Sequence, residues 1–425
     1  MDFNILLKRF GISSENFVNK LNEPIPIQDG FLYDVEQRTD IRNCPHCHHN
    51  DAHIVGYYFT NTNCSETDNF KDILRVKRVR FRCKKCGKTF TPKIKGIERY
   101  SIISEQTKRF IVSDFTKNFT FAQIAERYGL TKARVIQIFD EEVPFVPRRR
   151  MPRVLCIDEI HFEEVLDQKY CCVLYDFEKR EIVDIIRNRQ MPYLREYFSN
   201  IPFKERNNVE IFISDMYDAY STVQSNYFPK SIHIIDRFHI LTQLTRAVNT
   251  LRVRVMNTCV EKGSLFYNFM KTHWQEYLRR YEDIPPKTYT YKKTFEAFDY
   301  QELVLESIKL DESLWSAHLI LQNVFHYSWN HTFEEALNFF MHTSETLLKS
   351  DSELLKKVGQ TYRRWRVEIA NAYTRNTKGI SYTNAIAECL NNQLKTMIKS
   401  AYGFHNFERF RKKAMLVLTY SKTEK

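Results

Sequence analysis

The sequence predicts an α/β core built on a mixed five-stranded sheet, preceded by a zinc-binding module and interrupted by a large all-α insertion. Three patterns lead to this prediction. Short apolar runs of β type lie between residues 153 and 235, paired cysteines precede them, and helical periodicity dominates after residue 236. The chain has 425 residues, more than one hydrophobic core organises, so several domains are expected.

Composition restricts the kind of protein. Hydrophobic residues make up 43% of the chain and aromatic residues 14%, which is ample for folded cores and excludes a disordered protein. The formal net charge of +12 favours a polyanionic partner. No run approaches the ~20 apolar residues of a membrane span, and residues 1–17 lack a signal-peptide pattern. A cytoplasmic protein with reduced or metal-bound cysteines is therefore expected.

Two CxxC pairs, Cys44–Cys47 and Cys83–Cys86, predict a structural zinc site. Each pair suits a tight turn that presents two thiolates to a tetrahedral Zn²⁺, and Gly87 follows the second pair as in a zinc knuckle. Residues 53–59 and 74–82 between the pairs have the alternation of strands, so the module is predicted to be a zinc ribbon. Four further residues could serve as zinc ligands but are more consistent with surface or loop positions, namely His46, His48, His49 and Cys64.

Basic residues accompany this module and the segments that follow it. The strand at 74–82 alternates apolar and basic residues, which predicts one positive face, with a solvated face as the alternative. Residues 120–139 contain a capped helix, a glycine turn and a second capped helix, the pattern of a helix-turn-helix or of an ordinary helical hairpin. Residues 144–153 read as a basic linker. The expected DNA contacts are Arg78, Arg80, Arg82, Lys84, Lys85, Thr131, Lys132, Arg134, Arg148, Arg149 and Arg150.

The central segment has the element order of an RNase H-like fold. Three strands come first, followed by a helix at 191–199, a strand, a second helix and a last strand. The β candidates are residues 153–159, 170–176, 181–186, 209–214 and 231–235. In such a fold the first and fourth strands pair in parallel, so Asp158 and Asp215, which end two of the apolar runs, would meet at adjacent strand ends.

Two adjoining carboxylates predict a divalent cation. They do not both ionise readily without a positive charge between them, and Mg²⁺ or Mn²⁺ supplies that charge while keeping coordination sites for water and phosphate. Two such ions, about 4 Å apart, serve phosphodiester chemistry by activating the attacking oxygen and stabilising the leaving one. A single aspartate at a strand end, by contrast, is more often a cap or turn residue.

From about residue 40 to 420 the chain resembles the ISL3-type transposases of bacterial insertion sequences. Four blocks in order carry the resemblance, namely Ile157–Glu159, Ser214–Tyr220, Asp236–His239 and Asn384–Lys395, the last followed by 399–404. The resemblance implies that Asp158, Asp215 and Glu388 form a catalytic, magnesium-binding triad. It also implies double-stranded DNA as partner, a homodimer or higher oligomer in the DNA complex, and a nucleoid-associated bacterial location. Ala385 and Cys389 stand where the family usually has glycine.

Other polar residues near the triad are interpreted more conservatively. Glu159 alternates to the opposite face of its strand from Asp158, which favours a structural role or a DNA contact. Asp218 is expected to cap a helix or to pair with a basic residue. Asp236 and His239 are expected to form local pairs rather than to bind metal.

The expected domains follow from these segments. They are an N-terminal helical segment (1–40), the zinc ribbon (41–97), the helix-turn-helix (98–147), an RNase H-like DDE domain (148–240 with 378–425), and a helical insertion without strand signals (241–377). Together they predict a transposase that binds the terminal inverted repeats of its element and performs Mg-dependent hydrolysis and strand transfer. The alternatives are a domesticated or inactive copy acting as a sequence-specific DNA-binding repressor, and an RNase H-like nuclease acting on RNA or Holliday junctions.

Overall fold

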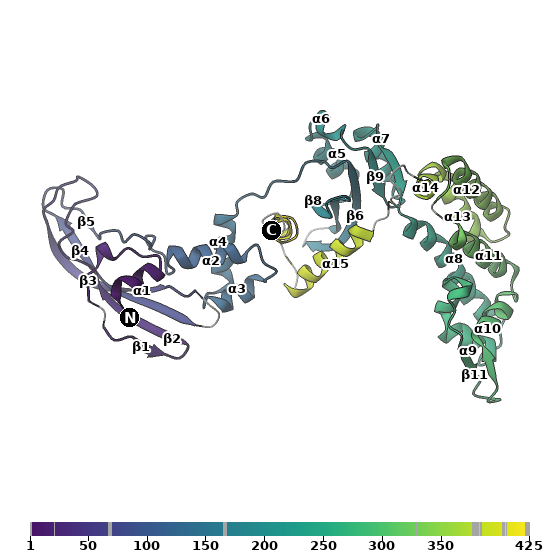
Figure 1. The fold of residues 1–425 in the computed structure, drawn as a ribbon, viewed down its shortest axis with the longest axis horizontal. Coiled ribbons are helices and arrows are strands. Elements are labelled where there is room, and N and C mark those ends of the chain that lie inside the picture. Colours follow the sequence, from purple (N-terminus) through teal and green to yellow (C-terminus); the bar gives the residue numbers. More distant parts are fainter. Residues whose placement is uncertain are drawn as a thin grey trace. The chain divides into compact units, whose positions relative to one another are not determined.

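The computed structural model describes residues 2–20, 22–66, 70–164, 168–328, 330–375, 382, 385–401, 404 and 406–420. Two compact units form, Met1–Pro147 together with Gln393–Lys425, and Arg148–Asn392. Figure 1 labels most of the helices and strands of both units.

The first unit contains a five-stranded sheet in the order β1-β2-β4-β3, with β5 paired to β4. Its strands are β1 (Ile25–Ile27), β2 (Gly30–Glu36), β3 (Ala52–Asn63), β4 (Lys71–Cys83) and β5 (Thr89–Phe90). β3 and β4 form the long antiparallel pair that the sequence predicts, whereas β2 pairs with β4 in parallel.

The N-terminal segment differs from its predicted helical structure. It begins with α1 (Phe3–Arg9) and a 3₁₀ turn (Ser14–Asn16), and then supplies β1 and β2 to the sheet. Tyr33 and Val35 of β2 are buried against α1, while Asp34 between them is only half-buried and pairs with Arg75. This period of two is that of a strand, which explains why these residues extend the sheet.

Three helices follow the sheet, α2 (Glu105–Asp114), α3 (Phe121–Arg127) and α4 (Lys132–Glu142). The predicted caps are confirmed: Thr120 forms a capping box at α3, and the side chain of Thr131 accepts a hydrogen bond from the backbone of α4. Gly129, between the two helices, has φ +61°, a conformation that glycine adopts without strain. The C-terminal helix α16 (Phe407–Leu418) joins this group, because Arg409 binds Asp140 at 2.6 Å.

The second unit is built on a mixed five-stranded sheet, as predicted, and its strand order is β10-β9-β6-β7-β8. Its strands are β6 (Val154–Glu164), β7 (Gln168–Asp176), β8 (Glu181–Ile186), β9 (Ile211–Ser214) and β10 (Ile232–Ile235). β6 pairs in parallel with β9 and antiparallel with β7, so the parallel pairing expected for the first and fourth strands is confirmed.

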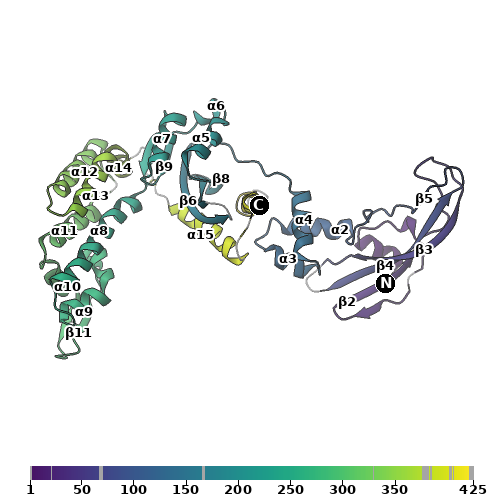
Figure 2. The ribbon, with the colours of Figure 1, turned by 180° about the vertical axis from the view of Figure 1, so that it is seen from behind.

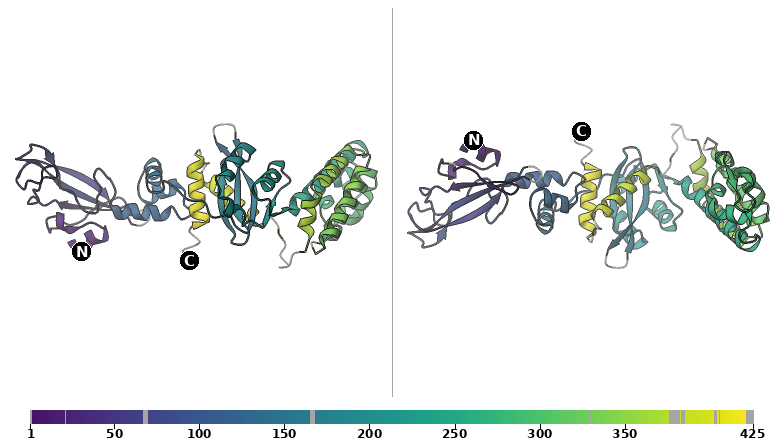
Figure 3. Two further views of the ribbon diagram at one scale, coloured as in Figure 1. Left: turned by 90° about the horizontal axis from the view of Figure 1, so that it is seen from above. Right: turned by 90° about the horizontal axis from the view of Figure 1, so that it is seen from below.

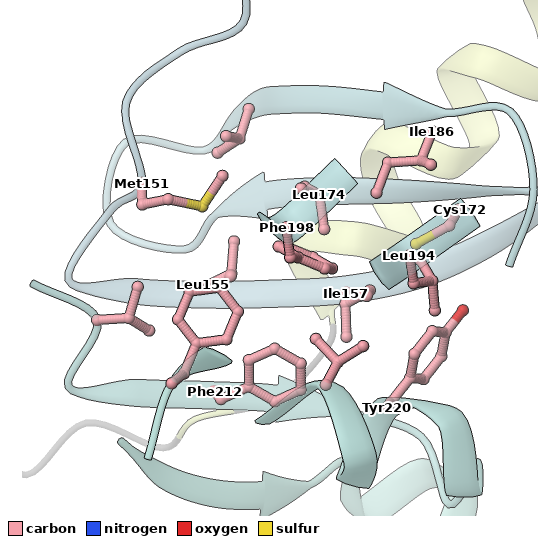
Figure 4. Packing of buried hydrophobic residues seen from close by; sticks show 14 of the residues in the cluster. Met151, Leu155, Ile157, Cys172, Leu174, Ile186, Leu194, Phe198, Phe212 and Tyr220 are labelled. Atoms are coloured by element: carbon pink, nitrogen blue, oxygen red, sulfur yellow. The ribbon is translucent and has the colours of Figure 1, made fainter. Parts of the chain in front are cut away.

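Helices lie on the two faces of this sheet (Figure 1). The helices of the crossovers are α5 (Met191–Ser199), α6 (Phe203–Arg206) and α7 (Asp218–Tyr227). Figure 4 shows the core on this side, where Leu155 and Ile157 of β6 pack with Leu194, Phe198 and Tyr220 of the helices. Helix α15 (Ala385–Ser400) lies along the sheet in Figures 1 and 3 and contacts β6 and β7 through Asn391.

The insertion between β10 and α15 is largely helical. Its helices are α8 (Arg237–Thr258), α9 (Leu265–Thr272), α10 (Tyr300–Ile308), α11 (Glu312–His326), α12 (Phe333–Leu348), α13 (Glu353–Arg364) and α14 (Arg366–Tyr373), with short 3₁₀ turns at Trp274–Leu278 and Tyr281–Asp283. The prediction of an all-α insertion is wrong at one place, where β11 (Thr288–Thr290) and β12 (Ala297–Asp299) form an antiparallel hairpin. Three residues per strand are too few to produce a visible alternation in the sequence.

Candidate active site and metal sites

Asp158 and Asp215 occupy equivalent positions on neighbouring parallel strands. Cys156 of β6 pairs with Ile213 of β9, and each aspartate lies two residues further along its own chain segment. The two aspartates are therefore at the same level of the sheet. Asp215 directly follows β9, but Asp158 is not at the end of its strand, contrary to the prediction. β6 continues past Asp158 because Glu159 and the residues after it pair with β7.

The environment of the two aspartates disfavours their negative charge. The pKa of Asp215 is raised to about 6, chiefly by burial; the charges of Glu159 and Asp158 also raise it, whereas His239 and Arg189 lower it. Burial also raises the pKa of Asp158, against the opposing hydrogen bond from the Glu159 backbone. Within the described part of the chain, Oδ1 of Asp215 is buried without a hydrogen-bond partner. Such an oxygen beside a second acid fits a divalent cation.

Asn391 joins helix α15 to the strand that carries Asp158. Its Nδ2 donates a hydrogen bond to Oδ2 of Asp158 at 2.9 Å. Its Oδ1 accepts a hydrogen bond from the hydroxyl of Tyr175 on β7. Both Asn391 and Tyr175 are buried, so neither group exchanges this contact for water. The backbone N–H of Glu159 donates to the other oxygen of Asp158 at 2.7 Å.

Glu388 lies on α15, three residues before Asn391, and its side chain is exposed. Residues three apart on a helix are neighbours on the helix surface, so Glu388 is on the side of α15 that contacts Asp158. Among the described residues, however, the oxygens of Asp158, Asp215 and Glu388 do not form a group within 4.8 Å of one another. The structure thus pairs the two aspartates and places Glu388 on the helix that binds one of them.

The neighbouring polar residues have distinct environments. Asp218 forms an ion pair with Arg364 at 2.7 Å, so the prediction of a basic partner is confirmed. His239 lies on α8, and its electrostatic interaction lowers the pKa of both Asp158 and Asp215. Asp236 directly precedes α8 and is buried.

Arg189 is a residue near the site that the sequence did not indicate. Its guanidinium binds Glu159 and lies 4.8 Å from the ring centre of Tyr170 and 5.1 Å from that of Tyr217. Its charge lowers the pKa of Asp215. Arg189 comes from a loop between β8 and α5, where one arginine has no distinguishing pattern. Tyr175 was also missed, because it reads as a core residue of an apolar strand.

The four predicted zinc ligands come together. One ligand atom from each of Cys44, Cys47, Cys83 and Cys86 lies within 4.8 Å of the others. The Sγ atoms of Cys44 and Cys86 are 3.7 Å apart, and those of Cys47 and Cys83 are 3.5 Å apart. Tetrahedral zinc with Zn–S bonds of about 2.3 Å requires sulfur atoms separated by about 3.8 Å, so the four thiols fit Zn²⁺.

The local backbone explains this convergence. In the first turn the N–H of His48 donates to the carbonyl of Cys44 at 2.8 Å, and in the second the N–H of Gly87 donates to the carbonyl of Cys83 at 3.0 Å. Both turns end in a residue with positive φ. Backbone N–H groups, that of Cys86 first, lower the pKa of Cys83 to about 7 and so favour its thiolate.

The candidate DNA contacts on β4 and directly after it differ in exposure and in pairing, and the Arg80 guanidinium lies 5.5 Å from the ring centre of Tyr58. Arg80 and Arg82 are exposed, as is Lys85 after the strand. Lys84 pairs with Asp51 at 2.9 Å. The rest of the expected positive face is neutralised by β2, since Asp34 and Glu36 bind Arg75 and Lys77 across the parallel register. Arg78 is partly buried.

The other candidate contacts differ in the same way. Lys132 is exposed and Arg134 half-buried at the start of α4, where Thr131 serves as the cap. In the expected linker, Arg148 is held by Glu205 at 2.6 Å and Arg149 lies 3.9 Å from Glu181. Arg150 is exposed. Of the three successive arginines, therefore, two face acids of their own unit.

The fold and the paired aspartates define a class of protein. A mixed sheet places two aspartates at one level, and the helix beside them carries Glu388. The chain belongs to the ISL3-type DDE transposase family, whose model, described as a transposase, matches residues 155–414. Membership implies a nuclease or transferase activity with DNA as partner. No curated protein matches the chain. Among the described residues, no helix combines the length and apolarity needed to cross a membrane.

Proposed function

We propose that the protein is the DNA transposase of a bacterial insertion sequence, which hydrolyses phosphodiester bonds at the element ends and transfers the freed 3′-hydroxyl to target DNA. The observation that carries this proposal is the equal level of Asp158 and Asp215 on β6 and β9, inside the segment that the family model matches. The strand order β10-β9-β6-β7-β8 supports an RNase H-like catalytic domain.

Asp158, Asp215 and Glu388 are proposed as the catalytic acids. They would hold Mg²⁺ or Mn²⁺, which supplies charge stabilisation at the reacting phosphate and activates the attacking oxygen. The protein's own contribution is positioning. β6 and β9 hold the two aspartates on a rigid sheet, and the buried Asn391 keeps the Glu388 helix beside Asp158. Sheet-borne ligands of this kind are held more precisely than ligands on loops.

The first unit is proposed to recognise the terminal inverted repeats. The four-cysteine cluster, proposed as a zinc ribbon, stabilises one end of the β3–β4 pair, from which Arg80, Arg82 and Lys85 project. Helices α3 and α4 are proposed to form a helix-turn-helix whose second helix enters a major groove, which the Thr131 cap and the exposed Lys132 at the start of α4 support. Cutting two ends and joining them to one target requires at least two active sites, so a homodimer or higher oligomer is proposed in the DNA complex.

The test uses the full chain and duplexes taken from the DNA that flanks its gene. We expect cleavage and strand transfer in Mg²⁺, and loss of both in Asp158→Asn, Asp215→Asn and Glu388→Gln, with unchanged DNA affinity. Asp218→Asn is the matched control, since its carboxylate is bound to Arg364 rather than to the site. Tight binding of the flanking duplexes without any cleavage by the parent chain would contradict the transposase and support the repressor. Preferential cleavage of RNA–DNA hybrids or four-way junctions would support the nuclease.

A further inference from the structure

The hairpin in the insertion carries an aromatic residue in an unfavourable backbone conformation. Phe295, in the turn between β11 and β12, has φ +59° and is 81% exposed. Figures 1 and 2 both show β11 beside α9 and α10, at the end of the helical group.

Hydrogen bonds hold this turn in a defined shape. The N–H of Phe295 donates to the carbonyl of Tyr291 at 2.7 Å, and the N–H of Tyr291 donates to the carbonyl of Glu296 at 2.9 Å. The Thr294 hydroxyl donates to the Glu296 carboxylate at 3.0 Å. At the base of the turn, the hydroxyl of Tyr291 donates to the carbonyl of Gly263 at 2.8 Å, which ties the hairpin to the start of α9.

Folding gives no reason for phenylalanine at this position. A positive φ favours glycine, because a Cβ in this region crowds the backbone. An exposed ring buries almost no apolar surface that would offset this strain. Residues held in sparsely populated backbone conformations are concentrated at binding and catalytic sites, so the observed outlier points to a ligand for the ring.

The charge around the ring indicates what kind of ligand it meets. Lys292 and Lys293 are exposed beside Phe295, and Lys287 is exposed at the base of the hairpin. The acid of the turn, Glu296, is already engaged by Thr294. An aromatic ring flanked by lysines matches a nucleic acid strand, whose bases stack on the ring and whose phosphates attract the ammonium groups.

We infer that Phe295 stacks on an unpaired or unstacked base of the DNA, while Lys292 and Lys293 contact the adjoining phosphates. This inference rests on the proposed function, which supplies DNA as the substrate. It assigns to the β11–β12 hairpin the opening of the DNA strands. A carboxylate of the sheet cannot stack on a base, so the proposed catalytic acids do not serve this step.

The experiment measures binding to duplexes taken from the DNA that flanks the gene. One duplex is fully paired, and each of the others contains a single unpaired 2-aminopurine at a different position. We expect the parent chain to prefer one unpaired duplex by about tenfold, as base–aromatic stacking allows. Bound 2-aminopurine at that position should lose fluorescence by stacking. Phe295→Gly should abolish both effects while raising the melting temperature by about 2 °C, because the strain is removed. Phe295→Tyr should retain the preference.

Tyr100→Gly is the matched control, since Tyr100 is also exposed with positive φ but has the Arg99 guanidinium 4.9 Å from its ring centre. This variant should keep the preference. An unchanged preference in Phe295→Gly would overturn the inference and leave the proposed function intact. If Phe295→Gly self-associates more weakly than the parent chain but keeps its DNA preference, the inference is also overturned. The partner of the Phe295 ring would then be a second copy of the protein. A parent chain that binds no duplex would overturn the proposed function itself.

Discussion

The side chain of Asn391 bridges Asp158 and Tyr175, with Nδ2 of Asn391 2.9 Å from Oδ2 of Asp158. Asn391 is 216 residues from Tyr175 along the chain, yet all three groups are buried or largely buried at one point of the sheet. This contact links the helix that carries Glu388 to the first aspartate. It therefore controls whether the third proposed acid is presented to the other two.

Removing the bridge should weaken both the fold and the metal site. Asn391→Ala leaves the Tyr175 hydroxyl and one oxygen of Asp158 buried without this partner, which is expected to cost about 1–3 kcal/mol of unfolding free energy. The Mg²⁺ concentration for half-maximal cleavage should rise, because the hydrogen bond from Asn391 orients the Asp158 carboxylate that would bind the ion. Urea unfolding and metal titration of cleavage measure the two effects. Lys395→Ala, at an exposed position on the same helix, should leave both unchanged.

A milder change at the same contact is made on the Tyr175 side. Tyr175→Phe removes the hydroxyl donor but keeps the hydrogen bond between Asn391 and Asp158. We expect a loss of stability with a smaller change in Mg²⁺ requirement than Asn391→Ala shows. An equal metal requirement in Asn391→Ala and the parent chain would contradict the positioning role.

Asp215 should make stability depend on pH and on metal. Its pKa in the folded chain is about 6, above the ordinary value of 3.8, so the folded state holds this proton more tightly than the unfolded state. Protonation of Asp215 therefore contributes at most about 3 kcal/mol to the free energy of unfolding below pH 4, and this contribution is lost as the pH rises through 6. In EDTA at pH 7, Asp215→Asn should therefore be more stable than the parent chain.

Mg²⁺ should reverse that order. Binding at 100 times Kd adds about 2.7 kcal/mol to the parent chain, whereas Asp215→Asn gains little. Thermal unfolding at pH 4 to 7, with EDTA or Mg²⁺, measures both parts. A melting temperature of the parent chain that is insensitive to Mg²⁺ would argue against metal binding by this pair. Asp218→Asn should behave as the parent does.

Zinc should stabilise the first unit and have no effect on the second. Cys86→Ser removes one exposed thiol from the four-cysteine cluster, and we expect loss of the single bound zinc and of protection of β3 and β4 against hydrogen exchange. The strands β6 to β10 should stay protected. Cys259→Ser, which also replaces an exposed thiol, is the control. Full protection of β3 and β4 after zinc chelation would show that the metal is dispensable.

Lys413 should make the first unit more stable at high pH. Burial lowers its pKa to about 7, against the opposing charge of Asp114, and its Nζ donates to the carbonyls of Phe115 and Lys117 at 2.8 Å. The folded state releases the proton near pH 7 and the unfolded state near 10.5, so stability should rise between these values. Lys413→Met should remove this slope in urea unfolding of the first unit. Lys395→Met, at an exposed position, should keep it.

Much of the local structure is present in the sequence. The cysteine pairs, the capped helices after Thr120 and Thr131, and the apolar runs that carry Asp158 and Asp215 are each defined within a dozen neighbouring residues. Hydrophobic periodicity and capping side chains act over this distance, so these turns, helices and central strands were predictable, whereas β1, β2 and the β11–β12 hairpin were not. The family resemblance added Glu388, which as an isolated helical acid has no distinguishing feature.

Contacts between distant segments decided the rest. β2 pairs with β4 in parallel, and this pairing brings Asp34 and Glu36 onto Arg75 and Lys77, so two cations of the expected positive face are neutralised. β6 extends past Asp158 because β7 offers a partner, and α15 meets Asp158 through one asparagine. The sequence by itself determined which residues form strands, caps and thiol turns, since those depend on near neighbours. The tertiary structure decided which charges are paired and which acids adjoin, because both depend on hydrogen bonds and burial between segments far apart in the chain.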